Sequence, residues 1–398
     1  MNMRFHLLLI AALVGHAVPA AADTAADLPA PDQPAQQLHL PDGFKAAIYA
    51  HSEEIDGARM MAFGPDGNLY VSDSRAGKVL MLPDSNRDGK ADEVVLVADG
   101  LNAPNGLVFV DGNLLVGNQD GIVRLQQKDG RWPANGTMPL IPDLPSGGHT
   151  LKTVKLGPDG YLYLNVGSSC NVCVESDPTR ATIQRYTKDG KPAGALTTVG
   201  RHKPTAVWAT GLRNAQGLAW HPKTGALYAT NDGADMRSDT KGGPPDDELP
   251  PEHFNHIEAG KNYGWPYCWG NRHPDPNFPT SAGYCEHTQA PAATFPSHST
   301  PIGFTFLDRA AAFPAEYRDD AIVALHGSWN RAQPSGYKLV RVKFKQDKPV
   351  EVTDFATGWL SARGAWGRPV DVIVGPDGAL FVSDDRAGII YRITYGKH

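Results

Sequence analysis

Short apolar runs separated by turns that contain Gly and Asp recur along most of this sequence. Apolar or alternating runs of about four to six residues are typical of β-strands, and an Asp-Gly turn supplies the positive φ that a tight hairpin needs. The turn aspartates Asp66, Asp111 and Asp159 follow one another at intervals of 45 and 48 residues. Units of this kind occupy residues 61–82, 107–125, 154–169, 218–233, 302–344 and 372–393. The pattern predicts an all-β protein built from repeated hairpin units.

A unit of three or four strands cannot cover both of its own faces, so such units stack around a common axis. Six units of this length predict a six-bladed β-propeller, in which radial repetition leaves only short strand edges. A strand at residues 43–50 is expected to complete the last blade and close the ring. The segment at about 236–301 is rich in Pro, Asp, Gly, His and aromatic residues, which predicts a long loop insertion on one face, stapled by Cys268 and Cys285.

The N-terminus has the features of a signal peptide at residues 1–22, namely Arg4, an apolar core at 5–18 and alanines at 20–22. Residues 23–40 lack periodicity and predict a flexible leader before a single domain at 41–398. The formal charge of −6 offers no basic face for nucleic acid. No later window approaches the length of a membrane span. These features predict a periplasmic or secreted protein.

Four cysteines in an oxidising compartment indicate disulfides, and four cysteines allow three connectivities. The local pairing of Cys170 with Cys173 and of Cys268 with Cys285 is preferred. Val174 follows Cys173 where haem attachment would require histidine, so that motif is excluded.

Four loop segments carry the polar residues best suited to chemistry. In a propeller the loops at one face converge on the axis, so residues distant in sequence can meet there. A histidine, several arginines and amides around one axis suit a planar polyanionic ligand, because arginine forks match carboxylates. Histidine can also act as a base near neutral pH. The four segments are residues 147–149, 211–217, 326–331 and 366–369.

Several longer stretches are similar to one known family. They read GGHTLKTVKLGPDGYLYLNVGSSCNVC, GLRNAQGLAWHP, DDEL followed by GKNYGWPYCWG, HGSWNR, and GRPVDVIVGPDG. The chain resembles the glucose/sorbosone dehydrogenases, soluble quinoprotein sugar dehydrogenases that use pyrroloquinoline quinone (PQQ). The SSCNVC loop and the region of Cys268 look closest to the sorbosone-dehydrogenase-like branch. The resemblance covers most of the chain after about residue 40.

The resemblance implies a six-bladed propeller that carries PQQ over one end of its axis. His149 would take the proton of the substrate hydroxyl, hydride would pass to the quinone carbonyl, and Arg213 would stabilise charge on the quinone oxygen. An aspartate precedes the base in the glucose-oxidising branch, whereas Gly148 does so here. Asn330 or Arg331 stands where that branch supplies a lysine. The residues implied to hold the cofactor are His149, Arg213, Asn214, Asn330, Arg331 and Arg368.

The resemblance also implies calcium, which prefers oxygen ligands. Backbone carbonyls at Gly233 and Ala234 would bind it, with Gln216 assisting. The acidic run Asp246, Asp247 and Glu248 would serve a further, structural calcium or form a solvated loop.

Residues 84–92 begin like an EF-hand loop, with Asp84 at the first position, but Val95 at position twelve excludes a full EF-hand. A calcium-stabilised hairpin and an ordinary Asp-Gly turn both stay open there.

The expected function is PQQ-dependent oxidation of an aldose or of an aldehyde-bearing sugar such as sorbosone, with electrons leaving to an external acceptor, a quinone or a cytochrome. Two alternatives stay open. A calcium-dependent propeller lactonase would need a carboxylate and amides on one central ion, and Arg213 and Arg368 argue against it. A non-catalytic propeller that binds a partner would hold no cofactor.

Overall fold

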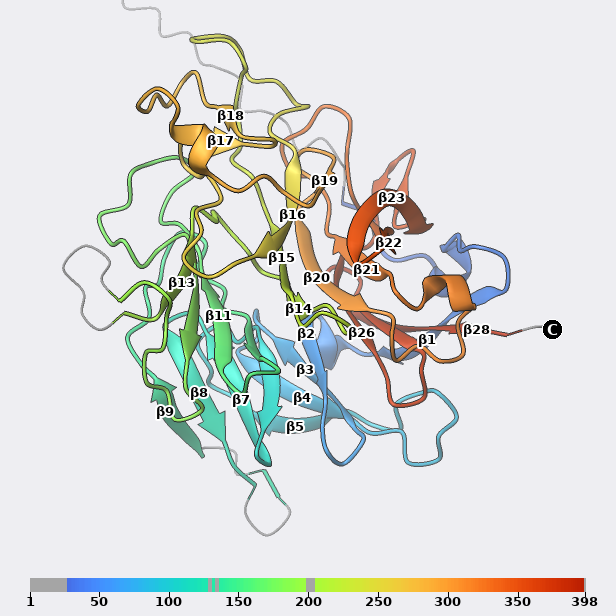
Figure 1. Ribbon diagram of the computed structural model, residues 1–398. Helices are drawn as coiled ribbons and strands as arrows, with labels where there is room; N and C mark the ends of the chain where they lie inside the picture. Colours follow the sequence, from blue (N-terminus) through green and yellow to red (C-terminus); the bar gives the residue numbers. More distant parts are fainter. Residues whose placement is uncertain (1–26, 128–130, 133–135, 198–204, 397–398) are drawn as a thin grey trace, which may run out of the picture.

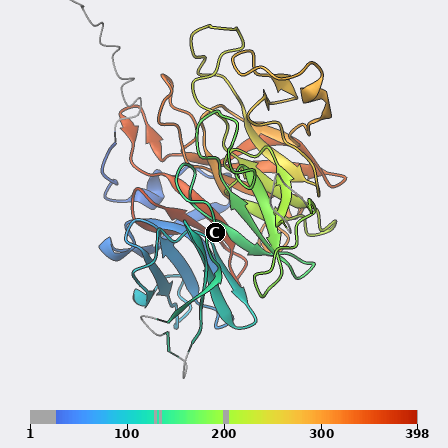
Figure 2. The ribbon, with the colours of Figure 1, turned by 90° about the vertical axis from the view of Figure 1, so that its left-hand side faces the viewer.

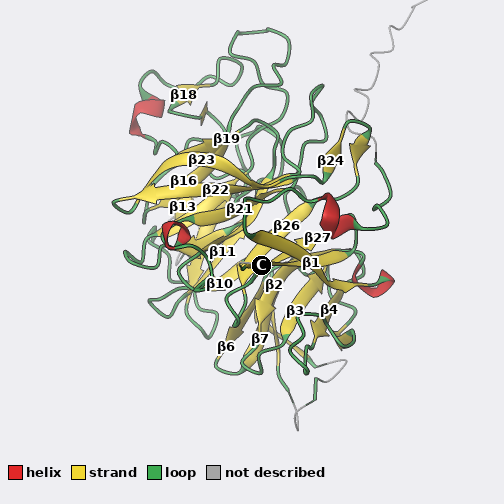
Figure 3. Ribbon diagram, turned by 90° about the vertical axis from the view of Figure 1, so that its right-hand side faces the viewer, coloured by secondary structure: helices red, strands yellow, loops and turns green. Residues whose placement is uncertain are grey.

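Six four-stranded antiparallel sheets are arranged around one axis in the computed structural model, which describes residues 27–127, 131–132, 136–197 and 205–396 (Figure 1). The predicted six-bladed β-propeller is confirmed. The predicted signal peptide at 1–22 lies outside the described residues. Helical structure within the described ranges is limited to short 3₁₀ turns at the edges of the sheets (Figure 3). No described helix has the length and apolar character required to cross a bilayer.

Each blade runs from an inner strand to an outer strand. The strands of blades 1 to 3, inner strand first, are β2 (Ala58–Phe63), β3 (Leu69–Asp73), β4 (Lys78–Leu82) and β5 (Val95–Ala98); β6 (Leu107–Val110), β7 (Asn113–Asn118), β8 (Gly121–Leu125) and β9 (Thr137–Ile141); β10 (Val154–Leu156), β11 (Leu162–Val166), β12 (Thr182–Tyr186) and β13 (Val207–Thr210).

The second half of the ring follows the same order. The strands of blades 4 to 6 are β14 (Leu218–Trp220), β15 (Leu227–Asn231), β16 (Glu252–Ile257) and β19 (Ala293–Phe295); β20 (Pro301–Phe306), β21 (Ala321–Leu325), β22 (Lys338–Lys345) and β23 (Lys348–Ala356); β26 (Pro369–Val374), β27 (Leu380–Asp384), β28 (Ile389–Tyr395) and β1 (Phe44–His51).

Small elements lie outside the blades. They are the strand pairs β17 (Cys268–Trp269) with β18 (His273–Pro274) and β24 (Leu360–Ser361) with β25 (Gly364–Ala365), and the 3₁₀ turns η1 (Pro34–Gln37), η2 (Glu53–Ile55), η3 (Tyr284–His287) and η4 (Ala315–Tyr317).

The first strand of the chain closes the ring, as predicted. β1 pairs antiparallel with β28, from Phe44 opposite Tyr395 to His51 opposite Ile389. The last blade therefore joins the two ends of the propeller, and its backbone hydrogen bonds hold the ring shut.

Aromatic residues at one repeated position hold neighbouring blades together. The second strand of four blades begins Leu-Tyr or Leu-Phe, and the aromatic ring reaches the inner strand of the next blade. These contacts contribute about 0.5–1.5 kcal/mol each beyond the area they bury. The pairs are Tyr70–Phe109 (4.9 Å), Tyr163–Trp220 (5.3 Å), Tyr228–Phe306 (5.9 Å) and Phe381–Phe63 (5.1 Å between ring centroids).

Two of these tyrosines also explain the conspicuous turn aspartates. The hydroxyl of Tyr70 donates to Asp66 at 2.8 Å, and the hydroxyl of Tyr163 donates to Asp159 at 2.9 Å. These turns join the first and second strands of their blades. Since successive strands are antiparallel, the turns lie at the end of the propeller opposite to the loops that precede the inner strands. The repeated Asp-Gly turns therefore serve the scaffold, and the other face is left for the four candidate loop segments.

The predicted leader is partly packed against the propeller. Leu28 N donates to Ala365 O at 2.9 Å, and His39 N donates to Thr357 O at 2.8 Å. Leu38 is buried with Phe44 in the core between blades 5 and 6. Apolar side chains and backbone hydrogen bonds therefore join part of residues 27–40 to the propeller.

The segment at 236–301 differs from the single insertion expected, because it contains two strands of blade 4, β16 and β19. The sequence of β16, EHFNHI, hides its strand character because polar and apolar residues are both buried in it. Two long loops remain, and the one with β17 and β18 projects beyond the blades (Figures 1 and 2).

Both predicted disulfides are confirmed, Cys170–Cys173 and Cys268–Cys285.

The Asp84 loop is held by hydrogen bonds from its backbone N–H groups to its own carboxylates. The Asp84 carboxylate accepts from the N–H groups of Asp88 (3.1 Å) and Gly89 (3.0 Å), and Asp92 accepts from Ser85 N at 2.7 Å. These bonds suffice for an ordinary turn.

Candidate active site

The loop that carries His149 lies close against the loop after β11. Gly148 has φ of +63°, and a Cβ there would come within 2.4 Å of Ser168 O. An aspartate at this position would clash, which explains the glycine before the histidine. The buried ammonium of Lys152 fixes the same loop by donating to three carbonyl oxygens, those of Gln119, Pro145 and Thr150.

The hydrogen bonds of His149 determine which of its ring nitrogens carries the proton. Nδ1 lies 2.8 Å from Ser168 Oγ, and that hydroxyl donates its own proton to Cys170 O at 2.7 Å. Nδ1 must therefore be the donor, and Nε2 keeps its lone pair. Burial and the nearby charge of Arg213 lower the pKa of His149 to about 4. The imidazole is neutral near pH 7 and can accept a proton.

Arg213 is fixed by acceptors from two other loops. Its side chain is 3% exposed and pairs with Asp232 at 3.1 Å and Asp235 at 3.0 Å. Nη2 and Nε also donate to Asn171, at 2.9 Å to Oδ1 and 3.2 Å to the main-chain oxygen. Every guanidinium nitrogen has an acceptor, so this cation is held in one orientation.

Three carboxylates lie around this arginine, and we call Asp232, Asp235 and Glu252 the acidic group. Glu252 is buried, and its carboxylate accepts from Gly233 N. Burial and the charge of Asp232 raise the pKa of Glu252 well above its usual range, and burial also raises the pKa of Asp232. Burial opposes ionisation of Asp235 too, but hydrogen bonding to His298 and the charge of Arg213 lower its pKa overall.

Asn330 joins the acidic group from blade 5. Its Nδ2 donates to Asp235 Oδ1 at 2.8 Å. Its Oδ1 is buried with no partner in the described part of the chain. This oxygen is an acceptor that a ligand can satisfy.

A second set of charges lies across the axis, and we call Arg59, Arg368, His326 and Asp385 the basic group. Arg59 Nη1 contacts Asp385 at 2.6 Å, and the other oxygen of Asp385 lies 2.9 Å from His326 Nε2. Burial lowers the pKa of His326 to about 4, so it is uncharged near pH 7. Among the described residues, the guanidinium of Arg368 donates to two carbonyl oxygens, those of His326 (3.3 Å) and Gly327, while its backbone N–H donates to Asp384 at 2.8 Å. Two arginines thus face one carboxylate.

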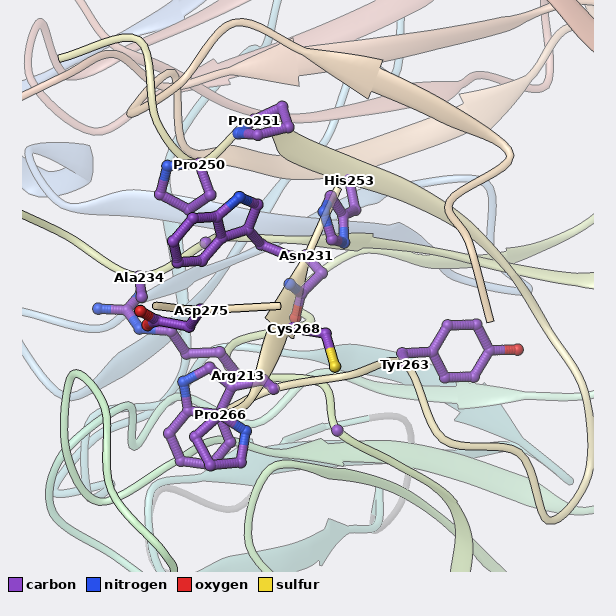
Figure 4. Close-up of a pocket in the computed structure, with 14 residues that line it drawn as sticks. Arg213, Asn231, Ala234, Pro250, Pro251, His253, Tyr263, Pro266, Cys268 and Asp275 are labelled. Carbon is purple, nitrogen blue, oxygen red and sulfur yellow. The ribbon is translucent and has the colours of Figure 1, made fainter. Parts of the chain in front are cut away.

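The other predicted site residues are dispersed around these groups. Asn214 Nδ2 lies 3.5 Å from Asp232, beside Arg213. Gln216 accepts from Arg59 at 3.3 Å, which places it at the axis with the basic group. Gly233 and Ala234 follow Asp232 and line a cavity of about 20 Å³ together with Arg213 (Figure 4). That volume admits one or two water molecules and is too small for a cofactor.

The acidic run at 246–248 contacts blade 5. Glu248 pairs with Arg331, and Asp247 accepts from Ala332 N at 2.6 Å. Asp246 accepts from Glu248 N at 2.9 Å within its own turn. Arg331 is thus directed to the run at 246–248, whereas Asn330 is directed to the acidic group. Within the described ranges, the one cluster of potential metal-ligating side chains is Cys170, Cys173 and Glu175, whose cysteines are consumed by the disulfide.

Sequence reasoning missed Arg59, Asp385, Asp235 and Glu252. One signal could have found Asp385. The segments 71–77 and 382–388 read VSDSRAG and VSDDRAG, and the single difference between them is Ser74 against Asp385. A departure from an otherwise identical repeat marks the residue with a separate role. Arg59 and Glu252 lie inside strands and carry no comparable signal.

The sequence model of the TrAA12-like family matches residues 38–396. An uncharacterized protein of Borreliella burgdorferi is 27% identical over 377 residues, 90% of this chain and 91% of that protein. The pyrroloquinoline quinone-dependent pyranose dehydrogenase of Coprinopsis cinerea is 24% identical over 418 residues, 92% of this chain. This chain spans 56% of that enzyme's length.

Solved structures share the fold. The calcium structure of a Trichoderma reesei carbohydrate-active enzyme of family AA12 has a TM-score of 0.76 at 18% identity, covering 93% of this chain and 100% of that one. The holo form of the PQQ domain of the Coprinopsis cinerea pyranose dehydrogenase has a TM-score of 0.74 at 22% identity, covering 92% and 98%. PQQ-dependent sugar dehydrogenases are therefore among the relatives of this chain.

Proposed function

Because the chain belongs to the TrAA12-like family, we propose that it is an exported, PQQ- and calcium-dependent dehydrogenase of aldoses or of aldehyde-bearing sugars. The observation that carries the proposal is the neutral His149, whose Nε2 keeps its lone pair near the charge of the buried, oriented Arg213. A base and a fixed cation side by side are what removal of a hydroxyl proton and stabilisation of a developing oxyanion require.

The residues present fit PQQ, which is a planar molecule with several carboxylates. The basic group holds two arginines against one carboxylate, so positive charge remains for an anionic ligand. The unpartnered Asn330 Oδ1 offers a further polar contact. Arg59, Arg368, Arg213, Asn214 and Asn330 would hold the cofactor. When bound, PQQ supplies the two-electron acceptor for the sugar.

The acidic group provides negative charge near which a divalent cation could be held. Three carboxylates surround one arginine there, and burial raises the pKa of two of them, Asp232 and Glu252. Hard oxygen donors of this kind suit calcium. The carbonyls of Gly233 and Ala234, in the same segment as Asp232, would supply ligands, and the carboxylates would supply the balancing charge. Gln216, at the axis beside Arg59, would assist at its edge.

The roles of the protein groups follow from their contacts. His149 Nε2 accepts the proton of the reacting hydroxyl, while Ser168 and Cys170 O hold the imidazole in the tautomer that can do so. Arg213 opposes negative charge that develops beside it and cannot swing away, because Asp232, Asp235 and Asn171 hold it.

Substrate, acceptor and compartment complete the proposal. The SSCNVC loop supports a sorbosone-like aldehyde sugar alongside simple aldoses. An external quinone or cytochrome would remove the electrons. The two disulfides and the signal-peptide pattern at 1–22 support a periplasmic or secreted protein.

Reconstitution tests the proposed function. Purified protein is given PQQ and calcium, singly and together, and dye reduction is followed with a panel of aldoses and sorbosone. Sugar-dependent reduction that needs both additions is the expected result. Lactone hydrolysis that needs a metal but no quinone would contradict it and favour the lactonase.

A further inference from the structure

Among the described residues, Asn171 makes the hydrogen bonds that join the loop closed by the Cys170–Cys173 disulfide to the environment of Arg213. Its Oδ1 accepts from Arg213 Nη2 at 2.9 Å and from Asp235 N at 2.8 Å, and its Nδ2 donates to Asp235 O at 2.9 Å. Its main-chain oxygen accepts from Arg213 Nε at 3.2 Å and Trp265 Nε1 at 3.0 Å. Asn171 thus ties Arg213, the acidic group and the long loop of blade 4 together.

The same loop also determines the tautomer of His149. Ser168 Oγ accepts from His149 Nδ1 at 2.8 Å and donates to Cys170 O at 2.7 Å. If Cys170 O moved, the Ser168 hydroxyl could instead donate to Nδ1, and the proton would shift to Nε2. Residues 168–171 therefore hold both the proposed base and the proposed oxyanion-stabilising cation.

The two disulfides differ in their access to solvent. Cys268 and Cys285 are 6% and 4% exposed, whereas Cys170 and Cys173 are both partly exposed. Thiol–disulfide exchange requires that a thiolate reach a disulfide sulfur. A reductant in solution will reach Cys170–Cys173 first.

We propose that Asn171 is a positioning residue for Arg213, and that the Cys170–Cys173 disulfide keeps it in place, so that reduction of this bond lowers turnover. The proposal rests on the proposed function, because the loop affects turnover only through the roles proposed for His149 and Arg213. In the reduction, a dithiol transfers two electrons to the S–S bond, which breaks. Each cysteine sulfur ends as a thiol, and the dithiol becomes a disulfide.

Substitution tests the positioning role. In the holoenzyme, Asn171→Ala is expected to lower kcat by about tenfold to a hundredfold, since small displacements of catalytic groups cost this much. KM should stay close to that of wild type. Val172→Ala, the neighbouring residue in the same four-residue loop, is the matched control and should keep full kcat. Equal kcat in the two variants would overturn the assignment.

Hydrogen–deuterium exchange supplies a readout that needs no turnover. Asn171→Ala should raise exchange in residues 211–217, and Val172→Ala should not. If wild type shows no PQQ-dependent turnover, the proposed function fails while this measurement still tests the positioning role. Unchanged exchange in 211–217 would contradict the role of Asn171 even in an active enzyme.

Mild reduction tests the disulfide. Folded protein is treated with dithiothreitol, alkylated and desalted before assay, and the modified cysteines are mapped by mass spectrometry. Alkylation of Cys170 and Cys173 should precede that of Cys268 and Cys285 and should match the loss of kcat. The double variant Cys170→Ser/Cys173→Ser should start with low kcat and not respond to the reductant. Full kcat after complete alkylation at 170 and 173 would refute the proposal.

Discussion

The two sides of the site carry opposite charge. The acidic group sets the carboxylates of Asp232, Asp235 and Glu252 around one guanidinium, that of Arg213, with the His298 imidazole 3.4 Å from Asp235. The basic group instead sets two guanidinium groups, those of Arg59 and Arg368, near the carboxylate of Asp385. His326 does not alter this balance, because burial keeps it neutral near pH 7.

The arginines on the two sides consequently have different duties. Arg213 is compensated by carboxylates, so its value lies in its orientation. Within the described part of the chain the guanidinium of Arg368 donates to carbonyl oxygens, so its charge stays available to an anion. The sequence does not distinguish the roles of Arg213 and Arg368, whereas their hydrogen-bond and ion-pair partners in the structure do. The acidic group has more carboxylates than cations, which suits a bound divalent cation. The basic group has more guanidinium groups than carboxylates, which suits a polyanionic cofactor.

Removal of the proposed base, His149, should have the largest effect on turnover. His149→Asn is expected to lower kcat by about 10² to 10⁴, the usual worth of a positioned general base. PQQ affinity should hardly change, because the cations that bind the cofactor are kept. Stopped-flow turnover and a PQQ titration measure the two quantities. Full activity in this variant would refute the assignment of the base.

Loss of a cation from the basic side should weaken the cofactor. Arg368→Ala is expected to raise the Kd of PQQ by about tenfold to a hundredfold, since a hydrogen bond to a charged group is worth about 1.5–3 kcal/mol. Arg386→Ala is the matched control, because Arg386 lies in the same blade but pairs with exposed Asp27. Equal Kd values for the two variants would remove Arg368 from the cofactor site.

Loss of a carboxylate from the acidic side should weaken calcium. Glu252→Gln keeps an acceptor for Gly233 N but removes a buried carboxyl group that could ionise. The calcium concentration for half-maximal activation should rise by about tenfold or more, as for other groups that support metal ligands. An unchanged calcium requirement would separate Glu252 from the metal.

The pH dependence should reflect the low pKa of His149. A base acts only when neutral, so kcat falls as pH drops through the pKa of His149, which burial lowers to about 4 from 6.5. At about pH 5.5 the enzyme should keep nearly full kcat, where an unperturbed histidine would leave about a tenth. A kcat profile recorded from pH 3.5 to 8 with calcium saturating measures this. An acid limb near 6.5 would contradict the buried, neutral imidazole.

Changes at the edge of the site should matter least. Glu248 is 71% exposed and pairs with Arg331. Glu248→Gln should cost less than about 1 kcal/mol of unfolding free energy, as for exposed ion pairs. The calcium requirement for turnover should stay as in wild type. A large loss of calcium-dependent stability would instead support a structural calcium at 246–248.

The propeller scaffold could be predicted from the sequence because the signals that mark it are local in the chain. The Asp-Gly turns, the strands and the closely spaced cysteine pairs are each read within a few residues. β16 was missed because its buried positions include Glu252, His253 and Asn255, which break the apolar pattern. The burial of these polar side chains depends on loops from elsewhere in the chain, so it cannot be predicted from the sequence of β16 itself.

The site was predictable only where a motif marked it. His149 and Arg213 lie in glycine-containing loops that the sequence singles out. Their partners Ser168, Asn171 and Asp235 come from other loops. Loops that converge at a propeller axis bring residues together that have no fixed spacing in the sequence. Such pairings follow from three-dimensional convergence and cannot be deduced from one sequence.

The central claim is that one site binds a polyanionic cofactor and a divalent cation together. An equilibrium titration of the wild-type protein with PQQ, in calcium and in a chelator at equal ionic strength, tests it most directly. Coupled sites usually differ by about 5- to 150-fold in affinity. The account predicts that calcium tightens PQQ binding by a factor in this range. Identical affinities in the two conditions, or no PQQ binding in either, would contradict it.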